Sequence, residues 1–355
     1  MRIPIYQSKG RKITATLIVA CALVAATITT LMITSARRPQ PEADNLELAA
    51  KIASPDQISA LSQDDTELDS SRIHPPPFRF SEERQNFSEN DRKWRILGSN
   101  KRGKDNHEAI LGFLHHRMLH FTFDDGPNAG TTSRILDMLP EYNVRATFFV
   151  VGKYLFGPHA QVHRDLLKRI EKDGHTVAVH SYTHNDFRHL SDSQINRELY
   201  RSGRVLEAIL GYRPGLIRLP YGGRSERTNS QLHARGYTEI LWNIAPEEYG
   251  ARTPQEILGN FQAALDRQER HDRGPGGIVL LHDNRAATVQ ALPRLMEELR
   301  RRNCALVQQE GQELWDVVDD LSYFLVYVNE LPESLVERRQ VLARTAAIRY
   351  CAEHS

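Results

Sequence analysis

Two adjacent carboxylates, Asp124 and Asp125, follow a short stretch with strand character. The run at 121–123 reads Phe-Thr-Phe, which suits a strand, and the Gly-Pro pair at 126–127 signals a turn. Neighbouring side chains on an extended chain point to opposite sides. We therefore expect the two acids to have different roles in metal-assisted hydrolysis, one holding a metal and the other handling a proton.

Two histidines four residues apart supply candidate metal ligands. His180 and His184 stand in the sequence His-Ser-Tyr-Thr-His, and this spacing puts both imidazoles on one side of a helical turn. Two imidazoles and one carboxylate form a three-ligand set that leaves positions open for water and substrate, as a catalytic zinc or a related divalent ion requires. The histidine pair alone is a weak signal, and the acidic pair strengthens it.

Strands that alternate with helices must position these residues. We predict strands at 119–123, 146–151, 176–179, 216–218, 239–242, 277–281 and 305–307. We predict helices at 131–142, 159–172, 192–210, 228–235, 254–267 and 288–301. About seven alternations with short connections indicate parallel strands with helical crossovers, and a closed or nearly closed β/α barrel is the economical arrangement.

Polar residues stand at the ends of most predicted strands. In chain order they are Asp124, Asp125, His180, Arg218, Trp242, His282 and Asp283. The carboxyl ends of the strands of a β/α barrel all lie on one face. The sequence therefore predicts that these side chains form one site.

The composition limits the other functions open to the chain. Its 355 residues, 40% of them hydrophobic, suffice for one large domain or two ordinary ones. A formal net charge of +1 gives no electrostatic reason to propose nucleic acid as a partner. The three cysteines include no Cys-x-x-Cys pair, which excludes a thiolate zinc site. Cys304 borders the predicted strand 305–307 and is expected to be buried; a disulfide with Cys351 is permissible outside the cytoplasm, but spacing does not establish it.

The amino-terminal region reads as a membrane anchor. Basic residues precede the uncharged segment 13–34, which is long enough for a helix that crosses the hydrocarbon core, with the amino end inside. Two alternatives stay open: a signal peptide cleaved near Ala25 and Ala26, and a lipoprotein box at 18–21. All three place the bulk of the protein beyond the cytoplasmic membrane.

The rest of the chain divides by composition. Residues after the anchor are charged, rich in serine and interrupted by proline, as in a flexible stalk. Helical patterns follow the last predicted strand. We predict a cytoplasmic basic segment at 1–12, an anchor at 13–34, a stalk at 35–114, a catalytic domain at 115–310 and a helical extension at 311–355.

Five segments resemble, in order and spacing, the motifs of the polysaccharide deacetylases, the NodB-homology domain of carbohydrate esterase family 4. They are Thr-Phe-Asp-Asp-Gly-Pro at 122–127, Ala-Thr-Phe-Phe-Val at 146–150, His-Ser-Tyr-Thr-His at 180–184, Arg-Leu-Pro-Tyr-Gly at 218–222 and Leu-Leu-His-Asp at 280–283. The resemblance covers about 119–307 and leaves out the anchor, the stalk and the tail.

The resemblance implies a distorted β/α barrel that hydrolyses N-acetyl groups, and in some members O-acetyl groups, on sugars. It implies a divalent metal, most often Zn²⁺, with Co²⁺ and Ni²⁺ as alternatives. Carried over by motif, Asp125, His180 and His184 match the metal ligands. Asp124 matches the catalytic base, Arg218 the arginine that orients it, Tyr221 the residue whose backbone N–H faces the oxyanion, and His282 the general acid.

The fifth-strand motif departs from the family. It reads Trp-Asn-Ile-Ala-Pro-Glu-Glu-Tyr at 242–249, with Ala245 where an aspartate is common and Glu248-Tyr249 in place of Asp-Trp. In the family, that aspartate partners the catalytic histidine and the tryptophan lines the acetyl pocket. We expect Glu248 to reach His282 with a longer arm and Tyr249 to supply a ring with a polar tip. Trp242 is a candidate to line the substrate.

The leading hypothesis is a membrane-anchored, metal-dependent deacetylase of an extracytoplasmic glycan that contains N-acetylglucosamine, with peptidoglycan as its first candidate. Chitin oligomers, exopolysaccharide and acetylated xylan stay open as substrates. The alternatives are a catalytically silent glycan-binding protein, an O-acetyl esterase on another polysaccharide, and a hydrolase of small non-sugar amides. The sequence does not indicate an oligomeric state.

Overall fold

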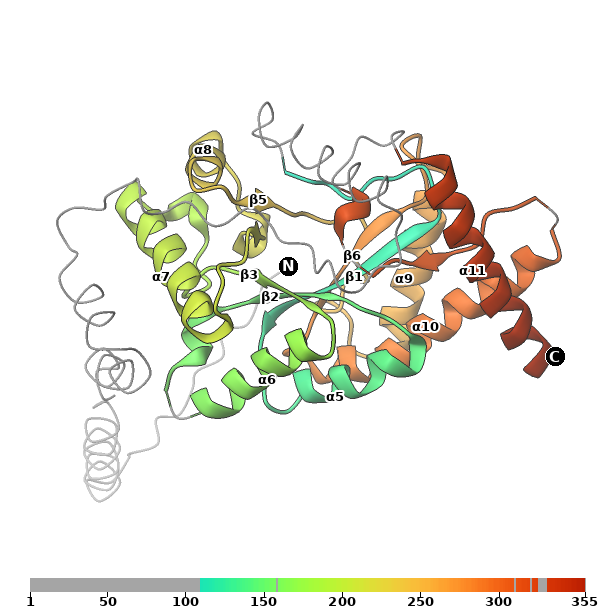
Figure 1. Ribbon diagram of the computed structural model, residues 1–355, viewed down its shortest axis with the longest axis horizontal. Coiled ribbons are helices and arrows are strands. Elements are labelled where there is room, and N and C mark those ends of the chain that lie inside the picture. Colours follow the sequence, from blue (N-terminus) through green and yellow to red (C-terminus); the bar gives the residue numbers. More distant parts are fainter. Residues whose placement is uncertain (1–108, 158, 310, 320, 325–330, 355) are drawn as a thin grey trace, which may run out of the picture. The chain divides into compact units, whose positions relative to one another are not determined.

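The computed structural model describes residues 109–157, 159–309, 311–319, 321–324 and 331–354 (Figure 1). The predicted cytoplasmic segment and anchor, and all of the predicted stalk except 109–114, lie outside these residues. None of the helices in the described ranges has the length and apolar character that a membrane crossing demands.

The chain alternates strands and helices from its first described residues onward. The strands are β1 (Met118–Gly126), β2 (Thr147–Val150), β3 (Thr176–Val179), β4 (Leu216–Ile217), β5 (Thr238–Glu239), β6 (Gly277–His282) and β7 (Asp316–Val317). The α-helices are α5 (Thr132–Met138), α6 (Ala160–Lys172), α7 (Asp192–Leu210), α8 (Glu226–Ala234), α9 (Pro254–Glu269), α10 (Ala286–Val307) and α11 (Glu333–Glu353). Short 3-10 turns are η3 (Leu139–Tyr142), η4 (Gly152–Leu155), η5 (Phe187–His189), η6 (Pro220–Gly222) and η7 (Leu321–Phe324).

All seven strands belong to one parallel sheet. Their order is β5-β4-β3-β2-β1-β6, and β7 pairs with the beginning of β1 (Figure 1). Asp124 of β1 lies opposite His282 of β6, and Val179 of β3 lies opposite Ile217 of β4. The predicted α/β class with about seven parallel strands is confirmed.

The chain after β5 joins the two edges of the sheet. The Ile240 N–H donates to the Ile217 carbonyl at 2.8 Å on the β4 side. Ile244 pairs with Val279 of β6 in an isolated parallel bridge. Gly277 permits this approach, since a Cβ there would lie 2.2 Å from the Ile244 side chain. An irregular stretch thus closes the strands into a ring where the sequence predicts a longer fifth strand.

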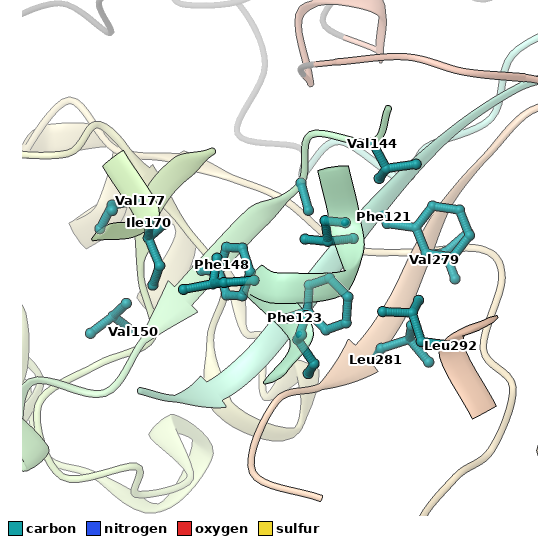
Figure 2. Close-up of a cluster of buried hydrophobic side chains, with 14 of the residues drawn as sticks. Phe121, Phe123, Val144, Phe148, Val150, Ile170, Val177, Val279, Leu281 and Leu292 are labelled. Atoms are coloured by element: carbon teal, nitrogen blue, oxygen red, sulfur yellow. The ribbon is translucent and has the colours of Figure 1, made fainter. Parts of the chain in front are cut away.

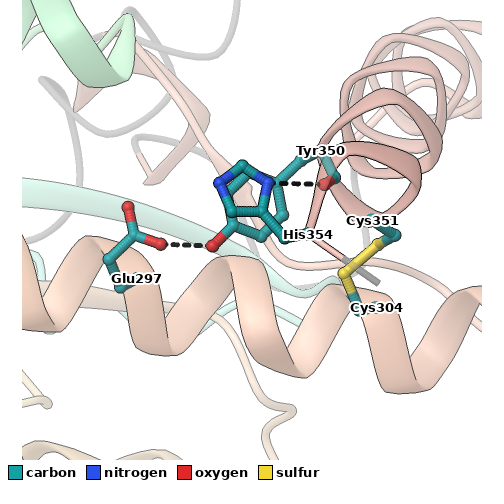
Figure 3. The surroundings of a disulfide bond; sticks show 5 residues. All are labelled: Glu297, Cys304, Tyr350, Cys351 and His354. Carbon is teal, nitrogen blue, oxygen red and sulfur yellow. Dashed lines mark hydrogen bonds between the residues drawn. A yellow bond between two sulfur atoms is a disulfide. The ribbon is translucent and has the colours of Figure 1, made fainter.

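The prediction of a seventh strand at 305–307 is wrong. Residues 305–307 are the last turn of α10, and the seventh strand is β7, which lies in the predicted helical extension. A run of three apolar residues does not distinguish a strand from a buried helix face. Cys304 is accordingly helical, and it is bonded to Cys351 of α11 (Figure 3).

Alternation along the central strands divides their residues between two faces, each with a buried apolar cluster. Leu119, Phe121 and Phe123 of β1 belong to the large buried cluster that packs the sheet against the helices (Figure 2). The alternate residues Thr122 and Asp124 lie on the other face, because side chains on a strand alternate with period two. The same alternation applies to β2, β3 and β6, whose apolar members Phe148, Val150, Val177, Val279 and Leu281 share that cluster. The inner face carries the second apolar cluster, which includes Phe149, Ala178 and Ile278, and polar residues such as Asp124 lie at its carboxyl-terminal end.

The carboxyl-terminal helix is attached to the sheet by specific bonds. The Arg339 guanidinium of α11 makes two hydrogen bonds to the Asp316 carboxylate of β7, at 2.6 and 2.8 Å. The Cys304–Cys351 disulfide joins α10 to α11, with 5.7 Å between the two Cα atoms. These contacts make β7 and α11 part of the folded domain.

Candidate active site

The two acids lie where β1 becomes irregular. The pairing of β1 with β2 shifts register between Asp124 and Gly126, and Asp125 has a φ of 74°. The expectation that the two side chains point to opposite sides is wrong, because this bulge turns Asp125 away from the extended geometry. Both carboxylates approach His180, whose Nε2 lies 3.7 Å from Asp124 Oδ2 and 3.4 Å from Asp125 Oδ1.

The two histidines lie on an irregular loop. Ser181 and His184 have φ values of 64° and 67°, so the expected helical turn is wrong. The His184 N–H donates to Ser181 Oγ at 2.9 Å, which closes the loop and turns the second imidazole toward the first. The two rings lie 5.0 Å apart between centroids. Left-handed backbone at two non-glycine residues costs free energy, which neighbouring contacts must offset.

Glu198 of α7 supplies those contacts. Its carboxylate accepts the N–H groups of Tyr182 and Thr183 at 2.9 and 2.8 Å, and the Thr183 hydroxyl at 2.6 Å. The helix that carries Glu198 begins with a capping box at Ser191. A buried acid on a well-capped helix therefore fixes the loop that carries both histidines.

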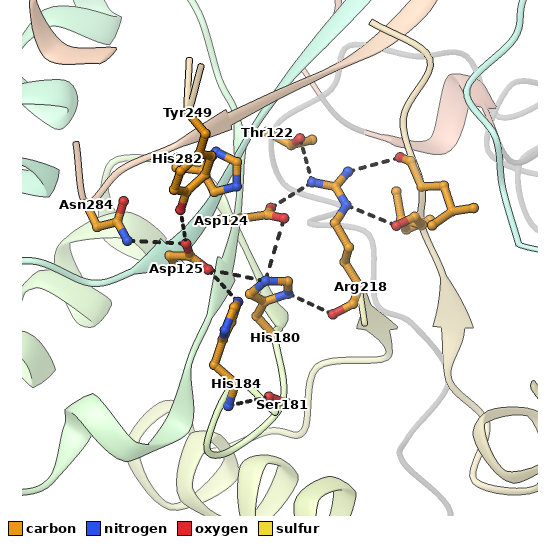
Figure 4. Close-up of polar contacts among 12 residues, drawn as sticks. Thr122, Asp124, Asp125, His180, Ser181, His184, Arg218, Tyr249, His282 and Asn284 are labelled. Atoms are coloured by element: carbon orange, nitrogen blue, oxygen red, sulfur yellow. Dashed lines mark hydrogen bonds and ion pairs between the residues drawn. The ribbon is translucent and has the colours of Figure 1, made fainter. Parts of the chain in front are cut away.

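Three side chains form a candidate metal centre. Ligand atoms of Asp125, His180 and His184 all lie within 4.8 Å of one another (Figure 4). His184 Nε2 is 2.9 Å from Asp125 Oδ1, and this buried oxygen accepts no hydrogen bond from the described residues. His180 Nδ1 donates to the Arg218 carbonyl at 2.8 Å, which leaves its Nε2 as a lone-pair donor. Two imidazoles and one carboxylate fit a divalent cation with open coordination positions.

The second oxygen of Asp125 is bound from the other side. Asp125 Oδ2 accepts the Tyr249 hydroxyl at 2.6 Å and the Asn284 amide at 3.2 Å. Burial acts to raise the pKa of Asp125, but the contacts with His180, His184 and Tyr249 outweigh it and hold the pKa well below its usual range. Asp125 is thus a carboxylate with one oxygen fixed by donors and the other directed at the histidines.

Asp124 is paired with a buried arginine. Arg218 Nη1 lies 2.7 Å from Asp124 Oδ1 and 2.9 Å from the Thr122 hydroxyl. The remaining nitrogens donate to the carbonyls of Ile240 and Leu241, both at 3.0 Å. The guanidinium is fully buried, so all its donors need such acceptors. The segment that closes the barrel therefore also holds the arginine that orients Asp124.

His282 lies on the opposite side of the site, at the end of β6. Its Nδ1 is 3.4 Å from Glu248 Oε2. Glu248 is buried, and its Oε1 accepts the His282 N–H at 2.7 Å and the Thr288 hydroxyl at 2.6 Å. Burial acts to lower the pKa of His282, but Glu248 and the two aspartates at the end of β1 outweigh it, so the pKa is raised. Glu248 thus lies next to the His282 ring, as expected for a side chain that is longer than the usual aspartate.

The remaining predicted residues surround the cluster. Tyr249 is 56% exposed, and its ring meets the His282 ring edge-on, with centroids 4.4 Å apart. Tyr221 is 64% exposed, has a φ of 60° and contacts His184. Trp242 is half-buried, and the Arg218 Cζ lies over it, 5.4 Å from the centroid of the Trp242 ring. All of the predicted site residues therefore lie around one centre.

Three residues of this neighbourhood were not predicted from the sequence: Glu198, Asn284 and Arg285. Asp283, a predicted strand-end residue of the site, is buried. Asp283 accepts the Thr132 hydroxyl at 2.7 Å, and burial raises its pKa to about 7. Asn284 and Arg285 directly follow the motif His-Asp and carry polar side chains at a strand end, a signal that sequence reasoning could have used. Glu198 sits on a helix face, where nothing in the sequence marks it.

Comparison with known proteins matches this geometry to one family. Residues 114–240 match the family model for polysaccharide deacetylase. The chain is 31% identical over 191 residues to the peptidoglycan-N-acetylmuramic acid deacetylase PdaC of Bacillus subtilis, which covers 54% of this chain and 38% of that protein. It is 30% identical over 201 residues to a chitooligosaccharide deacetylase of Bradyrhizobium sp., which covers 52% of this chain and 86% of that protein.

Among solved structures, the chitin deacetylase from the fungal pathogen Colletotrichum lindemuthianum is 27% identical, with a TM-score of 0.49 over 55% of this chain and 85% of that one.

Proposed function

Because the chain belongs to the polysaccharide deacetylase family, we propose that it hydrolyses N-acetyl groups on a glycan that contains N-acetylglucosamine, with peptidoglycan as the first candidate. One observation carries this proposal. The metal-binding group Asp125, His180 and His184 lies beside Asp124, and His282 faces Asp124 from the neighbouring strand. An amide is a poor electrophile, and this arrangement supplies a base, an acid and a cation site around one point.

The proposed metal is Zn²⁺, with Co²⁺ and Ni²⁺ as alternatives, held by Asp125, His180 and His184. When bound, such an ion polarises a carbonyl and makes a water molecule more acidic. The buried Oδ1 of Asp125 accepts no hydrogen bond from the described residues, and it lies within 4.8 Å of ligand atoms of His180 and His184, so the three side chains can share one cation.

The protein's own groups carry the proton transfers. Asp124, held by Arg218, accepts a proton from the attacking water. The amine must leave protonated, and His282, whose pKa Glu248 helps to raise, donates that proton. The backbone N–H of Tyr221, on its strained turn next to His184, is proposed to stabilise the oxyanion.

The family's usual aspartate is absent at Ala245, and Glu248 supplies a carboxylate to the histidine in its place. Activity is therefore expected despite the departure. Tyr249 supplies a ring beside His282, and Trp242 lies beneath the arginine. Tyr221, Trp242 and Tyr249 are proposed to contact the sugar.

The site is proposed to act outside the cytoplasmic membrane. Two observations support this location: the basic and apolar pattern of residues 1–34, and the Cys304–Cys351 disulfide, because disulfides persist in oxidising compartments. An anchored enzyme would remain within reach of the cell wall.

The test measures acetate release by the zinc-loaded protein from N-acetylglucosamine oligomers and from peptidoglycan, with and without a chelator. We expect release that the chelator abolishes and zinc restores. Binding of the glycan without release would instead support a silent glycan-binding protein. Mass spectrometry of wall glycan from cells with Asp124→Asn should show extra acetyl groups, and an unchanged acetyl profile would remove peptidoglycan as the substrate.

A further inference from the structure

Arg285 lies at the edge of the site on the side of the general acid. It follows the motif His-Asp-Asn and immediately precedes α10. Its guanidinium lies over the Tyr249 ring, 4.3 Å from the centroid. Tyr249 in turn donates to Asp125, and Asn284, the neighbour of Arg285, also donates to Asp125. Arg285 is therefore two contacts from the metal-binding group.

This arginine has no counter-charge in the described part of the chain. Its side chain makes no hydrogen bond or ion pair with a described residue, and its Nε is buried without an acceptor. The carboxylates nearby are engaged elsewhere: Asp125 with its own donors, and Glu248 with His282 and Thr288.

Four other arginines on segments that follow the strand ends differ in this respect. They contact carboxylates: Arg188 with Asp186, Arg218 with Asp124, Arg224 with Glu239 and Arg227 with Asp192. A cation whose charge is unmatched beside a catalytic centre favours an anionic ligand.

The shape of the guanidinium limits the kind of anion. The Arg285 Cζ lies over the Tyr249 ring, and the N–H groups of a guanidinium point outward along its edge. That edge presents paired N–H groups, which match the two oxygens of a carboxylate.

We propose that Arg285 binds a carboxylate that the glycan carries close to the scissile acetamide. The inference rests on the proposed deacetylase function and narrows its substrate class to acidic glycans. A muramic acid unit fits, since its lactyl carboxylate is attached beside the carbon that bears the acetamide. A carboxylate of a stem peptide offers the same chemistry, and the substrates below distinguish the two sources.

The experiment uses the zinc-loaded full chain and four substrates. They are a neutral N-acetylglucosamine oligomer, peptide-free wall strands with free lactyl carboxylates, the same strands with these groups converted to neutral methyl amides, and strands that keep their peptides. For the wild type we expect kcat/KM to be about tenfold higher on the free-carboxylate strands than on the amidated strands, as one charge-assisted contact provides. A preference restricted to peptide-bearing strands would assign the carboxylate to the peptide.

The variants are Arg285→Gln, Arg285→Lys and the control Arg349→Gln, an exposed arginine on α11. Arg285→Gln should reduce the ratio between charged and amidated strands to about one, Arg285→Lys should retain part of it, and Arg349→Gln should retain all of it. Equal losses on both substrates in Arg285→Gln would overturn the proposal, because they would mean that Arg285 only supports Tyr249. An unchanged ratio in Arg285→Gln would also overturn it.

A binding measurement separates this inference from the proposed function. Calorimetric titration of the strands into zinc-loaded Asp124→Asn protein, with and without Arg285→Gln, reports the carboxylate contact without turnover. Absence of acetate release from every wild-type reaction would refute the deacetylase, and the titration would still decide the role of Arg285. Equal affinity of the two proteins for the free-carboxylate strands would overturn it.

Discussion

The two sides of the site are built differently. On the metal side, Asp124, Asp125 and His180 are buried at strand ends, and Arg218 at the end of β4 binds Asp124 through its guanidinium and His180 through its carbonyl. On the acid side, His282 is partly exposed, and its partner Glu248 comes from the irregular chain after β5, at 3.4 Å rather than in a short hydrogen bond. The metal side retains the residues of the family motifs, whereas the acid side keeps His282 but has Glu248-Tyr249 in place of Asp-Trp. The loop with His184 is fixed by the buried Glu198, and the chain after β5 carries the part in which the side-chain length has changed.

The largest effect should come from removing a metal ligand. Asp125→Ala should lose zinc and reduce acetate release by at least about a thousandfold, since a catalytic metal contributes several kcal/mol to transition-state stabilisation. Zinc content after dialysis and initial rates measure this. His189→Ala, a change at an exposed histidine of the next turn, is the matched control and should keep both. Full zinc content in Asp125→Ala would place the metal elsewhere.

Asp124→Asn should separate proton transfer from metal binding on the same side of the site. We expect kcat to fall about a thousandfold, the scale of general base catalysis, while zinc affinity stays near that of the wild type. Thermal unfolding should be recorded as well, because Arg218 loses its partner charge in this variant. Equal loss of zinc and activity would show that Asp124 is itself a ligand.

Glu248→Gln tests the acid side. Removal of this charge should lower the raised pKa of His282. A general acid must be protonated to act, so the alkaline limb of the activity profile should move to lower pH, and kcat should fall about thirtyfold. Glu247→Gln, the exposed neighbour, should leave the profile in place. An unshifted alkaline limb in Glu248→Gln would remove Glu248 as the partner of His282.

Tyr249→Phe tests the bond that links the two sides. Loss of the hydroxyl that donates to Asp125 should weaken zinc affinity by about tenfold, as outer contacts of metal ligands do. Competition with a chromophoric chelator measures the affinity without turnover. Tyr221→Phe, at an exposed tyrosine that contacts His184 through its ring, should not change the affinity. Similar zinc affinities for Tyr249→Phe and the wild type would make the tyrosine a sugar contact alone.

The sequence predicted the site best where residues that can bind a metal or transfer a proton stand at the ends of predicted strands. The acids at 124–125, the histidine pair and the alternation of strands and helices indicated both the class of fold and the place of the site. The relative orientation of the two acids was not predictable, because it depends on a register shift between β1 and β2, a property of two paired strands. The shape of the histidine loop likewise depends on Glu198, which lies fourteen residues beyond His184 on another element.

The sequence also did not determine the structure of short apolar runs or the pairing of the cysteines. Residues 305–307 suit either a strand or a helix, and only packing against α11 and the disulfide identifies the helix. The Cys304–Cys351 bond joins residues 47 positions apart, and the cysteine spacing gave no sign of it. Asn284 and Arg285 follow a predicted strand end, but their contacts with Asp125 and Tyr249 depend on how β6 lies beside the neighbouring segments.

The pairing of β7 with β1 has a practical consequence for anyone who shortens this protein. β2 pairs with β1 only from Thr122 onward, and β7 occupies the same edge at Met118 and Leu119. A fragment that stops at the end of the family match, or at residue 310, would leave this backbone edge open to pairing between molecules. Recombinant work should therefore retain the chain at least through Glu353, where α11 ends.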